Sequence, residues 1–341
     1  MTPRILIIAG SDSGGGAGIQ ADIKTVTMLG GHAMTAITAI TAQNTLGVQR
    51  VMPVPAEMVV AQITSCVSDI GVDAIKIGMI GSAEAAHAVA DAIESLDVPI
   101  VFDPVMVATS GSLLADADTI AAFERLMRLA TLVTPNLPEL VALCSAYAPA
   151  RAETPRSLAE RGDNILPFPV RAEPVEAPSP AHPDETPASP PVRPELVEGR
   201  AANAPPATRA STSSARTDGK AETLARTGDA AKALARATGA TILSKGGHAD
   251  GNRIVDRLVG PEGEIARWEG KRIDTLHNHG TGCTLASAIA TGLGGGRALE
   301  DSVARGIRFV RIALLSAPGL GQGHGPMGHS FGTIPFDEIE G

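Results

Sequence analysis

The sequence predicts an α/β fold in which helices cover both faces of a central, mostly parallel sheet. Short runs that are apolar throughout alternate with helical patterns over residues 4–145, and this alternation resumes after residue 225. Strands without a polar face are typical of parallel sheets that are buried on both sides. Of the 341 residues, 44% are apolar but only 2% aromatic, so the chain is long enough for a large core of Ala, Val, Ile and Leu.

The elements before residue 145 follow from the apolar runs and from the turn residues between them. Strands are expected at residues 5–9, 34–40, 51–54, 74–77, 99–102 and 132–134. Helices are expected at residues 19–29, 56–68, 83–95, 117–128 and 137–143. After residue 225 we expect a helix at 229–237, a strand at 241–243, a polar β-ribbon at 253–259 and 265–268, a helix beginning near Cys283 and a last helix at 299–316.

The composition changes between these two parts of the chain. Fourteen of the 25 prolines lie at residues 149–206, mixed with Ala, Glu, Arg, Ser and Thr. Such a segment buries too little apolar surface to offset its chain entropy, so residues 148–222 are expected to be disordered. Residues 169–176 resemble residues 191–198, which suggests an inserted repetitive element, with a partner-binding segment as the alternative. The predicted organisation is one domain, residues 1–147 and 223–341, interrupted by this insertion.

Composition argues against several classes of protein. The net charge is −9 and no basic stripe with interleaved aromatic residues occurs, which argues against a nucleic-acid surface. The first apolar run, residues 5–9, is too short for a signal peptide or a membrane span, so we expect no membrane association and a cytoplasmic location. The three cysteines lie far apart, which argues against zinc and against a disulfide framework. Cys66 and Cys144 fall in helical patterns and are interpreted as core residues.

Polar and glycine-rich stretches follow the predicted strands repeatedly. In an open parallel sheet, ligands bind beyond the carboxyl ends of the strands. The stretches that fall there are residues 10–18, 41–45, 78–79, 103–106, 134–139 and 245–248. Together they outline a candidate site along one edge of the sheet.

Residues 277–283, with the sequence His-Asn-His-Gly-Thr-Gly-Cys, precede a run of helix-forming residues. Gly280 and Gly282 should therefore lie in the turn that opens a helix, where unpaired amide groups and the positive dipole end favour an anion. Glycine also lets the backbone approach a phosphate closely. Cys283 would present its thiol to the same place. The alternative is a turn into a buried helix of small residues, with no ligand.

The glycine-rich loop at residues 10–18 does not match a dinucleotide-binding pattern. It lacks the G-x-G-x-x-G spacing, and no acidic residue follows the second strand to hold a ribose. A P-loop pattern, G-x-x-x-x-G-K-[ST], is also absent from the sequence. Because the loop leads into a helix that carries Gln20 and Asp22, we interpret it as a wall for a small substrate. A flexible turn is the alternative.

Taken together, these stretches resemble the bacterial hydroxymethylpyrimidine/phosphomethylpyrimidine kinases of thiamin biosynthesis, a ribokinase-like family. The resemblance covers nearly the whole chain outside residues 148–222, and it is specific because seven motifs occur in order. They are residues 15–25, Ala42-Gln43-Asn44-Thr45, Lys76-Ile77-Gly78-Met79, Asp103-Pro104-Val105-Met106, Pro135-Asn136-Leu137-Pro138-Glu139, Lys245-Gly246-Gly247-His248 and His279-Gly280-Thr281-Gly282-Cys283.

The resemblance implies a kinase that uses ATP and Mg²⁺ to phosphorylate the hydroxymethyl alcohol of a pyrimidine and then to convert the monophosphate into the diphosphate. Asp22 and Gln43 would hydrogen-bond the pyrimidine, and Gln43 suits an aminopyrimidine edge because its amide offers both a donor and an acceptor. Apolar and backbone walls would complete the substrate site, formed by Met79, Val105, Gly10 and Ala17. The alternative for Gln43 is a loop-capping amide.

The same resemblance implies a phosphate site. Lys245 would neutralise ATP phosphate charge, with Asn136, Thr281 and Gly282 as further ATP contacts. Glu139 would orient Mg²⁺ through water, a role that suits a hard cation with oxygen ligands. The alternatives are a solvated loop lysine at 245 and a helix-end carboxylate at 139.

Catalysis is expected at the opening of the Cys283 helix. The amides of Gly280, Thr281, Gly282 and Cys283 would receive the charge of the transferring phosphate, while Cys283 accepts the alcohol proton. A helix N-terminus is expected to favour its thiolate. The alternative is a thiol that only fills space at the turn.

The sequence departs from the family at two places. Asn278 stands where Thr usually precedes the His-Gly-Thr-Gly-Cys motif, and the insertion separates Glu139 from Lys245. Loop closure becomes costly only slowly with length, so the insertion should be tolerated.

Three rival functions remain open. They are a pyridoxal or pyridoxine kinase of the same superfamily, a catalytically idle ligand-binding regulator and a nicotinamide oxidoreductase. Cys283 favours the pyrimidine over pyridoxal, and the phosphate residues argue against an idle regulator. We also expect a homo-oligomer, a dimer, with the pyrimidine and ATP as its small-molecule partners.

Overall fold

The computed structural model describes residues 1–107, 111, 114–147, 227–248 and 251–331. These residues belong to one compact unit. The predicted disordered insertion at 148–222 lies outside the described residues, so the domain organisation stays a prediction. Within the described part of the chain, no helix is long and apolar enough to cross a membrane.

The centre of the unit is a nine-stranded sheet with the order β3-β2-β1-β4-β5-β6-β7-β8-β9. The six strands from β2 to β7 in this order are parallel, whereas β3, β8 and β9 pair antiparallel at the two ends. The mostly parallel sheet is therefore confirmed. The strands are β1 (Arg4–Ser11), β2 (His32–Asn44), β3 (Gly47–Pro53), β4 (Ala74–Ile77), β5 (Ile100–Phe102), β6 (Leu132–Val133), β7 (Thr241–Ser244), β8 (Arg253–Gly260) and β9 (Gly263–Lys271).

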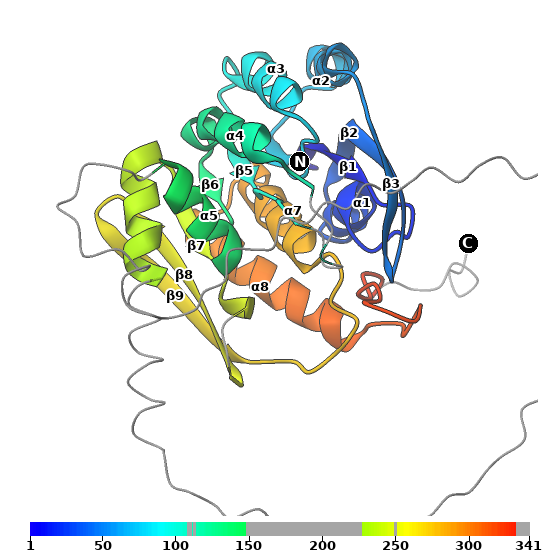
Figure 1. Cartoon of the computed structure of the whole chain (residues 1–341), viewed down its shortest axis with the longest axis vertical. Coiled ribbons are helices and arrows are strands. Elements are labelled where there is room, and N and C mark those ends of the chain that lie inside the picture. The colour runs from blue at the N-terminus through cyan, green and yellow to red at the C-terminus, as the bar shows by residue number, and fades with distance from the viewer. Residues whose placement is uncertain (108–110, 112–113, 148–226, 249–250, 332–341) are drawn as a thin grey trace, which may run out of the picture. The chain divides into compact units, whose positions relative to one another are not determined.

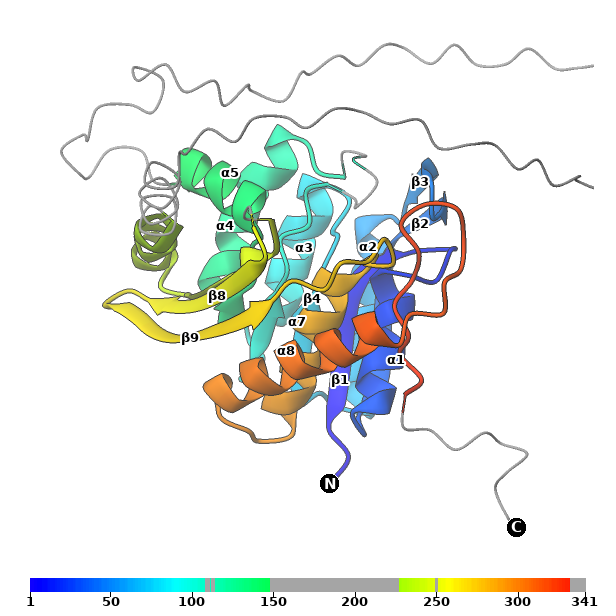
Figure 2. The same ribbon diagram turned by 90° about the horizontal axis from the view of Figure 1, so that it is seen from below.

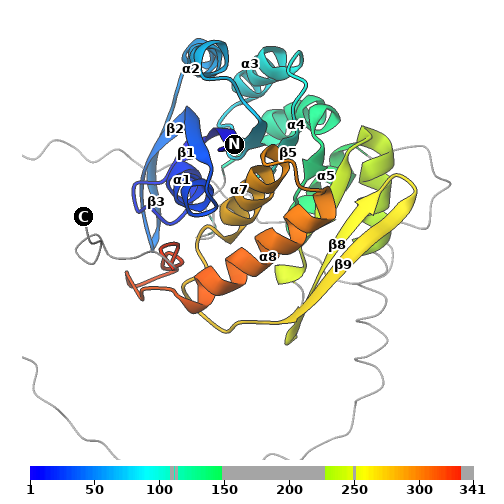
Figure 3. The same cartoon turned by 180° about the vertical axis from the view of Figure 1, so that it is seen from behind.

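Helices cover both faces of this sheet, as predicted (Figure 1). One face carries α2 (Ala56–Asp69), α3 (Ala83–Ile93), α4 (Ala117–Leu129), α5 (Leu137–Tyr147) and a helix over residues 227–238. The other carries α1 (Gly18–Met28), α7 (Thr281–Gly294) and α8 (Leu299–Leu315). Figure 2 shows the two helix layers on opposite sides of the strands, and Figure 3 shows α8 lying beside α7.

The core forms two apolar clusters, one on each face, because alternate side chains of a strand point to opposite sides. Along β1, Leu6 and Ile8 belong to the cluster under α2–α5, whereas Ile5 and Ile7 belong to the cluster under α1, α7 and α8. All four side chains are fully buried. This explains why the sequence of β1 is apolar at every position.

Local capping fixes where several helices begin. The Ser82 hydroxyl accepts a hydrogen bond from the Ala85 amide at the start of α3, and the Asp116 carboxylate accepts one from Thr119 at the start of α4. Each cap satisfies an amide that has no partner inside the helix. The helix starts therefore agree with the predicted ones, as does the α/β fold.

The second strand differs from its prediction. Residues 41–45 were expected to form a loop at a strand end, but Thr41–Asn44 continue β2. The physical reason is that β2 pairs antiparallel with β3 in this region, with Thr41 opposite Val51 and Asn44 opposite Gly47. The β2–β3 hairpin thus places Gln43 at the end of a strand rather than in a loop.

Candidate active site

Lys245 and the start of α7 meet at the carboxyl edge of the sheet. The Lys245 amide donates to the carbonyl of Pro135 over 3.0 Å, which continues the β6–β7 ladder to the edge. Its ammonium lies 2.8 Å from Asp103 Oδ1, and the Thr134 hydroxyl donates to that oxygen over 2.9 Å. Burial lowers the pKa of Lys245, but the Asp103 and Glu139 carboxylates raise it, and the net shift is upward. The side chain is therefore a cation.

The first turn of α7 has no room for side chains at its glycines. Gly280 has φ +85°, and a Cβ there would lie 1.9 Å from the Gly16 carbonyl oxygen. A Cβ on Gly282 would lie 3.0 Å from Asp103 Oδ2 and 3.2 Å from Lys245 Nζ. The first helical bond runs from the Thr284 amide to Gly280, so the amides of Thr281 to Cys283 precede it. Unpaired helix-end amides beside an ammonium favour a phosphate.

Glu139 and Asn136 bind each other at the start of α5. The Asn136 side-chain oxygen accepts from the Glu139 amide over 2.9 Å, and a Glu139 carboxylate oxygen accepts from the Asn136 amide over 2.8 Å. This reciprocal pair is a capping box. Burial and the nearby Asp103 carboxylate raise the pKa of Glu139 to about 7, although Lys245 lowers it. The structure thus shows the helix-end arrangement at Glu139, and the magnesium role expected from the sequence stays a prediction.

The structure gives Asp22 partners other than the predicted substrate atoms. Its carboxylate lies 2.7 Å from the Lys76 ammonium, and its second oxygen accepts from the Ser287 hydroxyl over 2.7 Å. The Asp22 and Lys76 side chains are 0% exposed. Both Asp22 oxygens are bound by protein groups, and the hydrogen bond to a pyrimidine expected from the sequence stays a prediction.

Asp12 organises the glycine-rich loop and joins it to the α7 motif. Its carboxylate accepts from the amides of Gly14, Gly16 and Ala17, and it lies 3.0 Å from His279 Nε2. Burial raises the pKa of Asp12, but His279 and the amides outweigh it, so the net shift is downward. Asp12 is thus an anion that fixes the loop through backbone amides. The flexible-turn alternative does not describe this loop.

Gln43 lies against the same histidine. Its side-chain nitrogen is 3.0 Å from His279 Nε2, and its side-chain oxygen accepts from the Thr41 hydroxyl over 3.3 Å. The side chain is half-buried. The backbone of Gln43 is held on both sides by Ser13, whose hydroxyl donates to the Gln43 carbonyl and accepts from its amide. Gln43 is therefore positioned by the glycine-rich loop.

The residues expected to form an apolar wall, Met79 and Val105, lie at the same edge, and their role stays a prediction. A Cβ on Gly10 would lie 3.0 Å from the sulfur of Met79, so the glycine allows Met79 to lie directly over the end of β1. The Met79 carbonyl accepts from the Thr38 hydroxyl over 2.6 Å. Val105 follows Asp103 in a tight turn in which the Val105 amide donates to the Asp103 carbonyl. Met79 and Val105 are both half-buried, as a wall of a site requires.

Cys283 is partly exposed at the start of α7, but its thiol is not activated in the way predicted. Burial and the Asp22 and Asp103 carboxylates raise the pKa of Cys283 to about 11, although Lys76 and the Gly18 amide lower it. The expectation that the helix end favours the thiolate is therefore corrected. Loss of hydration at the sulfur outweighs the helix end, and the resting group is a thiol.

Four charged or titratable residues of the site were given no role from the sequence. They are Asp12, Lys76, Asp103 and His279. A usable signal existed for Lys76, because a lysine inside the otherwise apolar run Ala74–Ile77 is rarely buried without a partner. For the others, the signal was only their place within a motif or a glycine-rich stretch.

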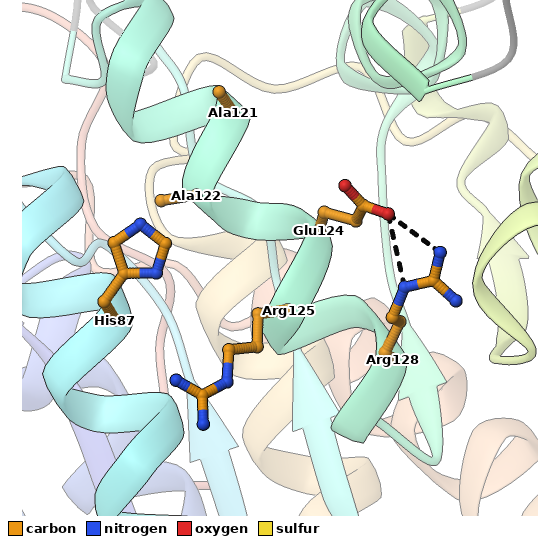
Figure 4. Close-up of a pocket in the computed structure, with 6 residues that line it drawn as sticks. All are labelled: His87, Ala121, Ala122, Glu124, Arg125 and Arg128. Carbon is orange, nitrogen blue, oxygen red and sulfur yellow. Dashed lines mark hydrogen bonds and ion pairs between the residues drawn. The ribbon is translucent and has the colours of Figure 1, made fainter.

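A pocket between α3 and α4 lies on the helix layer rather than at the carboxyl edge (Figure 4). It has a volume of about 180 Å³ and is lined by His87, Ala121, Ala122, Glu124, Arg125 and Arg128. Arg125 pairs with Asp91 and Glu94, and Arg128 pairs with Glu124. Since both arginines have protein partners, this pocket is a weaker candidate than the carboxyl edge.

Related proteins are found by sequence. The family model described as phosphomethylpyrimidine kinase matches residues 12–166 and 212–328. The hydroxymethylpyrimidine/phosphomethylpyrimidine kinase of Rhizobium meliloti is 37% identical over 332 residues, which cover 96% of this chain and 97% of that protein. A multifunctional thiamine biosynthesis protein of Corynebacterium efficiens is 33% identical, but the chain spans only 35% of its length.

Solved structures have the same fold. An ADP complex of pyridoxal kinase from Bacillus subtilis gives a TM-score of 0.67 at 26% identity, covering 97% of this chain and 98% of that chain. Phosphomethylpyrimidine kinase from Clostridium difficile gives a TM-score of 0.60 at 26% identity, covering 92% of this chain and 99% of that chain. These likenesses confirm the predicted ribokinase-like fold.

Proposed function

The chain belongs to the phosphomethylpyrimidine kinase family, and we propose that its carboxyl-edge site transfers phosphate from ATP to the hydroxymethyl group of a pyrimidine. The activity is that of a hydroxymethylpyrimidine/phosphomethylpyrimidine kinase of thiamine biosynthesis. The enzyme phosphorylates 4-amino-5-hydroxymethyl-2-methylpyrimidine and converts the monophosphate into the diphosphate. The dimeric state and the cytoplasmic location expected from the sequence stay predictions.

The observation that carries the site assignment is the meeting of Lys245 with the start of α7. The missing side chain of Gly282 leaves room beside the Lys245 ammonium and the Asp103 carboxylate, because a Cβ there would lie 3.2 Å from the ammonium and 3.0 Å from the carboxylate. A transferring phosphoryl group spreads negative charge over its oxygens. Helix-end amides together with a fixed cation stabilise such charge without reorganising. We assign Lys245 and the amides of Gly280–Cys283 to that task, with Asn136 as a further support.

The donor set also fits Mg²⁺ bound with ATP. Carboxylate oxygens are the ligands that this cation prefers, and it commonly keeps several waters. Glu139 and Asp103 interact electrostatically at this edge, and one Glu139 oxygen binds the Asn136 amide. Glu139 would therefore hold the ion through water. When bound, the ion supplies neutralisation of phosphate charge, while Glu139 must be ionised to attract it.

Substrate recognition is assigned to the other end of the edge. Gln43 presents an amide whose oxygen accepts from the Thr41 hydroxyl, and such an amide suits the amino group and ring nitrogen of an aminopyrimidine. Met79 and Val105 would contact the faces of the ring, next to the backbone of Gly10 and Ala17. A fixed amide discriminates better than a mobile one because less ordering is needed on binding.

A pyridoxal kinase is the alternative, because a pyridoxal kinase shares the fold. Purified full-length enzyme with Mg-ATP should be offered hydroxymethylpyrimidine, its monophosphate and pyridoxal in parallel, with ADP release as the readout. We expect turnover of both pyrimidines and a much lower rate with pyridoxal. Turnover of pyridoxal alone would overturn the pyrimidine assignment.

Replacing Gln43 with alanine should raise KM for hydroxymethylpyrimidine about two- to tenfold and leave KM for ATP unchanged. The loss of one hydrogen bond to a neutral partner costs about 0.5–1.5 kcal/mol, which corresponds to that range. Steady-state kinetics with each substrate varied in turn will measure both constants. Gln49→Ala, on the exposed part of β3, is the matched control. A raised KM for ATP with an unchanged pyrimidine KM would place Gln43 in the nucleotide subsite.

A further inference from the structure

A buried ion pair lies beneath the site and takes no part in the function proposed above. The Lys76 ammonium of β4 binds the Asp22 carboxylate of α1 over 2.7 Å, and both side chains are 0% exposed. The second Asp22 oxygen accepts from the Ser287 hydroxyl of α7 over 2.7 Å. Burial lowers the pKa of Lys76, but the surrounding anionic groups raise it, and the net shift is upward. Lys76 is therefore a permanent buried cation.

This cation is close enough to Cys283 for each group to affect the pKa of the other. Ser287 follows Cys283 by four residues on α7, so the two side chains share one face of the helix. A Cβ on Gly78 would lie 2.7 Å from the Lys76 ammonium, so the ammonium reaches to the carboxyl end of β4. The electrostatic effect is mutual: Lys76 lowers the pKa of Cys283, and Cys283 raises the pKa of Lys76.

Four charged groups act near the sulfur, each from a different part of the sheet edge. Lys76 comes from β4, Asp22 from α1, Asp103 from the end of β5 and Lys245 from the end of β7. The two carboxylates disfavour a thiolate. Burial of the sulfur has the largest effect on the pKa of Cys283. Lys76 has the second-largest effect, and it favours the thiolate. Lys76 is therefore the charge to change in a test of how easily Cys283 ionises.

We propose that Lys76, paired with Asp22, is a positioning residue that keeps a positive charge near Cys283 and so stabilises its thiolate. The inference deepens the proposed function and rests on it where it concerns catalysis. In the step concerned, the thiolate takes the proton of the substrate alcohol, so an S–H bond forms as the O–H bond breaks. The alcohol oxygen bonds to the γ-phosphorus, the bond to the ADP oxygen breaks with its electron pair, and Lys76 stays protonated throughout.

The coupling is testable without any substrate, through the rate at which iodoacetamide alkylates Cys283. Only the thiolate reacts, so the rate at about pH 8 follows the thiolate fraction. Each unit of pKa changes the rate about threefold, because a less basic thiolate is also a weaker nucleophile. Peptide mass spectrometry of the full-length protein separates Cys283 from Cys66 and Cys144. The residue is partly exposed, and the alkylation rate of wild type is the reference for each variant.

Two variants should shift this rate in opposite directions. Lys76→Met removes the cation and should slow alkylation about threefold or more, since a neighbouring opposite charge shifts a pKa by about one unit or more. Asp22→Asn removes an anion that disfavours the thiolate, while Asp103 and the sulfur itself still favour the Lys76 ammonium, so it should accelerate alkylation. Ser287→Ala keeps both charges and should leave the rate within about twofold of wild type. A residue that only fills space would not give shifts of opposite sign.

The double variant Asp22→Asn/Lys76→Met covers the case in which Lys76→Met does not fold, because it leaves no uncompensated buried charge. It should react more slowly than the single variant Asp22→Asn. Shifts of the same sign in the two single variants, or no shift, overturn the proposal. The dependence of kcat on pH then tests the catalytic part: parallel shifts in kcat support it. Altered alkylation with an unshifted kcat profile overturns Cys283 as the base.

Discussion

Replacing Lys245 with methionine should lower kcat/KM for ATP about 10²–10³-fold at neutral pH, the loss typical when a single fixed donor to developing charge is removed. The variant removes the cation beside the first turn of α7. It also leaves Asp103, which is 2% exposed, without its ion-pair partner. A buried carboxylate without a cation repels the phosphates that the site must bind. The loss should therefore exceed that of one hydrogen bond.

The same variant should move the pH dependence of the enzyme. Lys245 holds down the pKa of Glu139, which burial and Asp103 raise to about 7. Without Lys245 this pKa rises further, so Glu139 is protonated over more of the neutral range. If Glu139 must be ionised to attract Mg²⁺, the fall in activity on acidification should begin at a higher pH in the variant than in wild type. Plots of kcat/KM against pH at several magnesium concentrations will show the shift.

Two controls separate charge from fold in this experiment. Lys245→Arg keeps the cation and should retain more activity than methionine, although a guanidinium does not reproduce the ammonium geometry. Lys271→Met removes an exposed lysine of β9 and should leave kcat/KM unchanged. If Lys245→Met loses less than about tenfold, the helix-end amides act without it.

Most of the fold was predictable because it follows from local patterns. Strands that are apolar at every position, such as Ile5 to Ala9, indicate burial on both faces, and helices between them require parallel neighbours. The continuation of β2 through Thr41–Asn44 was not predictable, because these residues have no strand pattern. Pairing with β3 outweighs their weak local preference.

The location of the candidate site was predictable from the sequence, but the contacts between its side chains were not. The carboxyl ends of parallel strands converge on one edge, so Lys245, Asp103 and the α7 motif had to lie close together. The partner of Asp22 is Lys76, 54 residues away in the sequence, and depends on how α1 docks on β1 and β4. The capping box also had a local signal, because Asn136 and Glu139 stand three residues apart before a helix.

The largest error concerned the acid–base state of Cys283. A sequence reveals a helix start, which favours a thiolate, but it does not reveal how much water the fold removes from the sulfur. In the structure, burial is the largest influence and raises the pKa of Cys283 to about 11. The pKa of a group in the site therefore depends on how the fold buries it, and a sequence motif does not reveal that burial.

Replacing Cys283 with alanine should lower kcat about 10²–10⁴-fold, the usual contribution of a positioned general base. KM for ATP should change little, because the backbone amides of the α7 turn remain. Steady-state kinetics on both phosphorylations will measure the two constants. Cys66→Ala, in α2 and away from the carboxyl edge, is the matched control and should retain the wild-type kcat.

The dependence on pH distinguishes a base from a thiol that only fills space at the turn. With a pKa of about 11, Cys283 is a thiol at neutral pH, and a base must be deprotonated before it accepts a proton. The kcat of wild type should therefore rise with pH, by up to about tenfold per unit, as the thiolate fraction grows. In Cys283→Ala this rise should be absent, and Cys283→Asp should retain more activity than alanine because a carboxylate is already ionised. A near-normal kcat in the alanine variant, with the same slope against pH, would contradict the assignment of Cys283 as the base. Catalysis at the α7 turn would then rest on the amides of Gly280–Cys283.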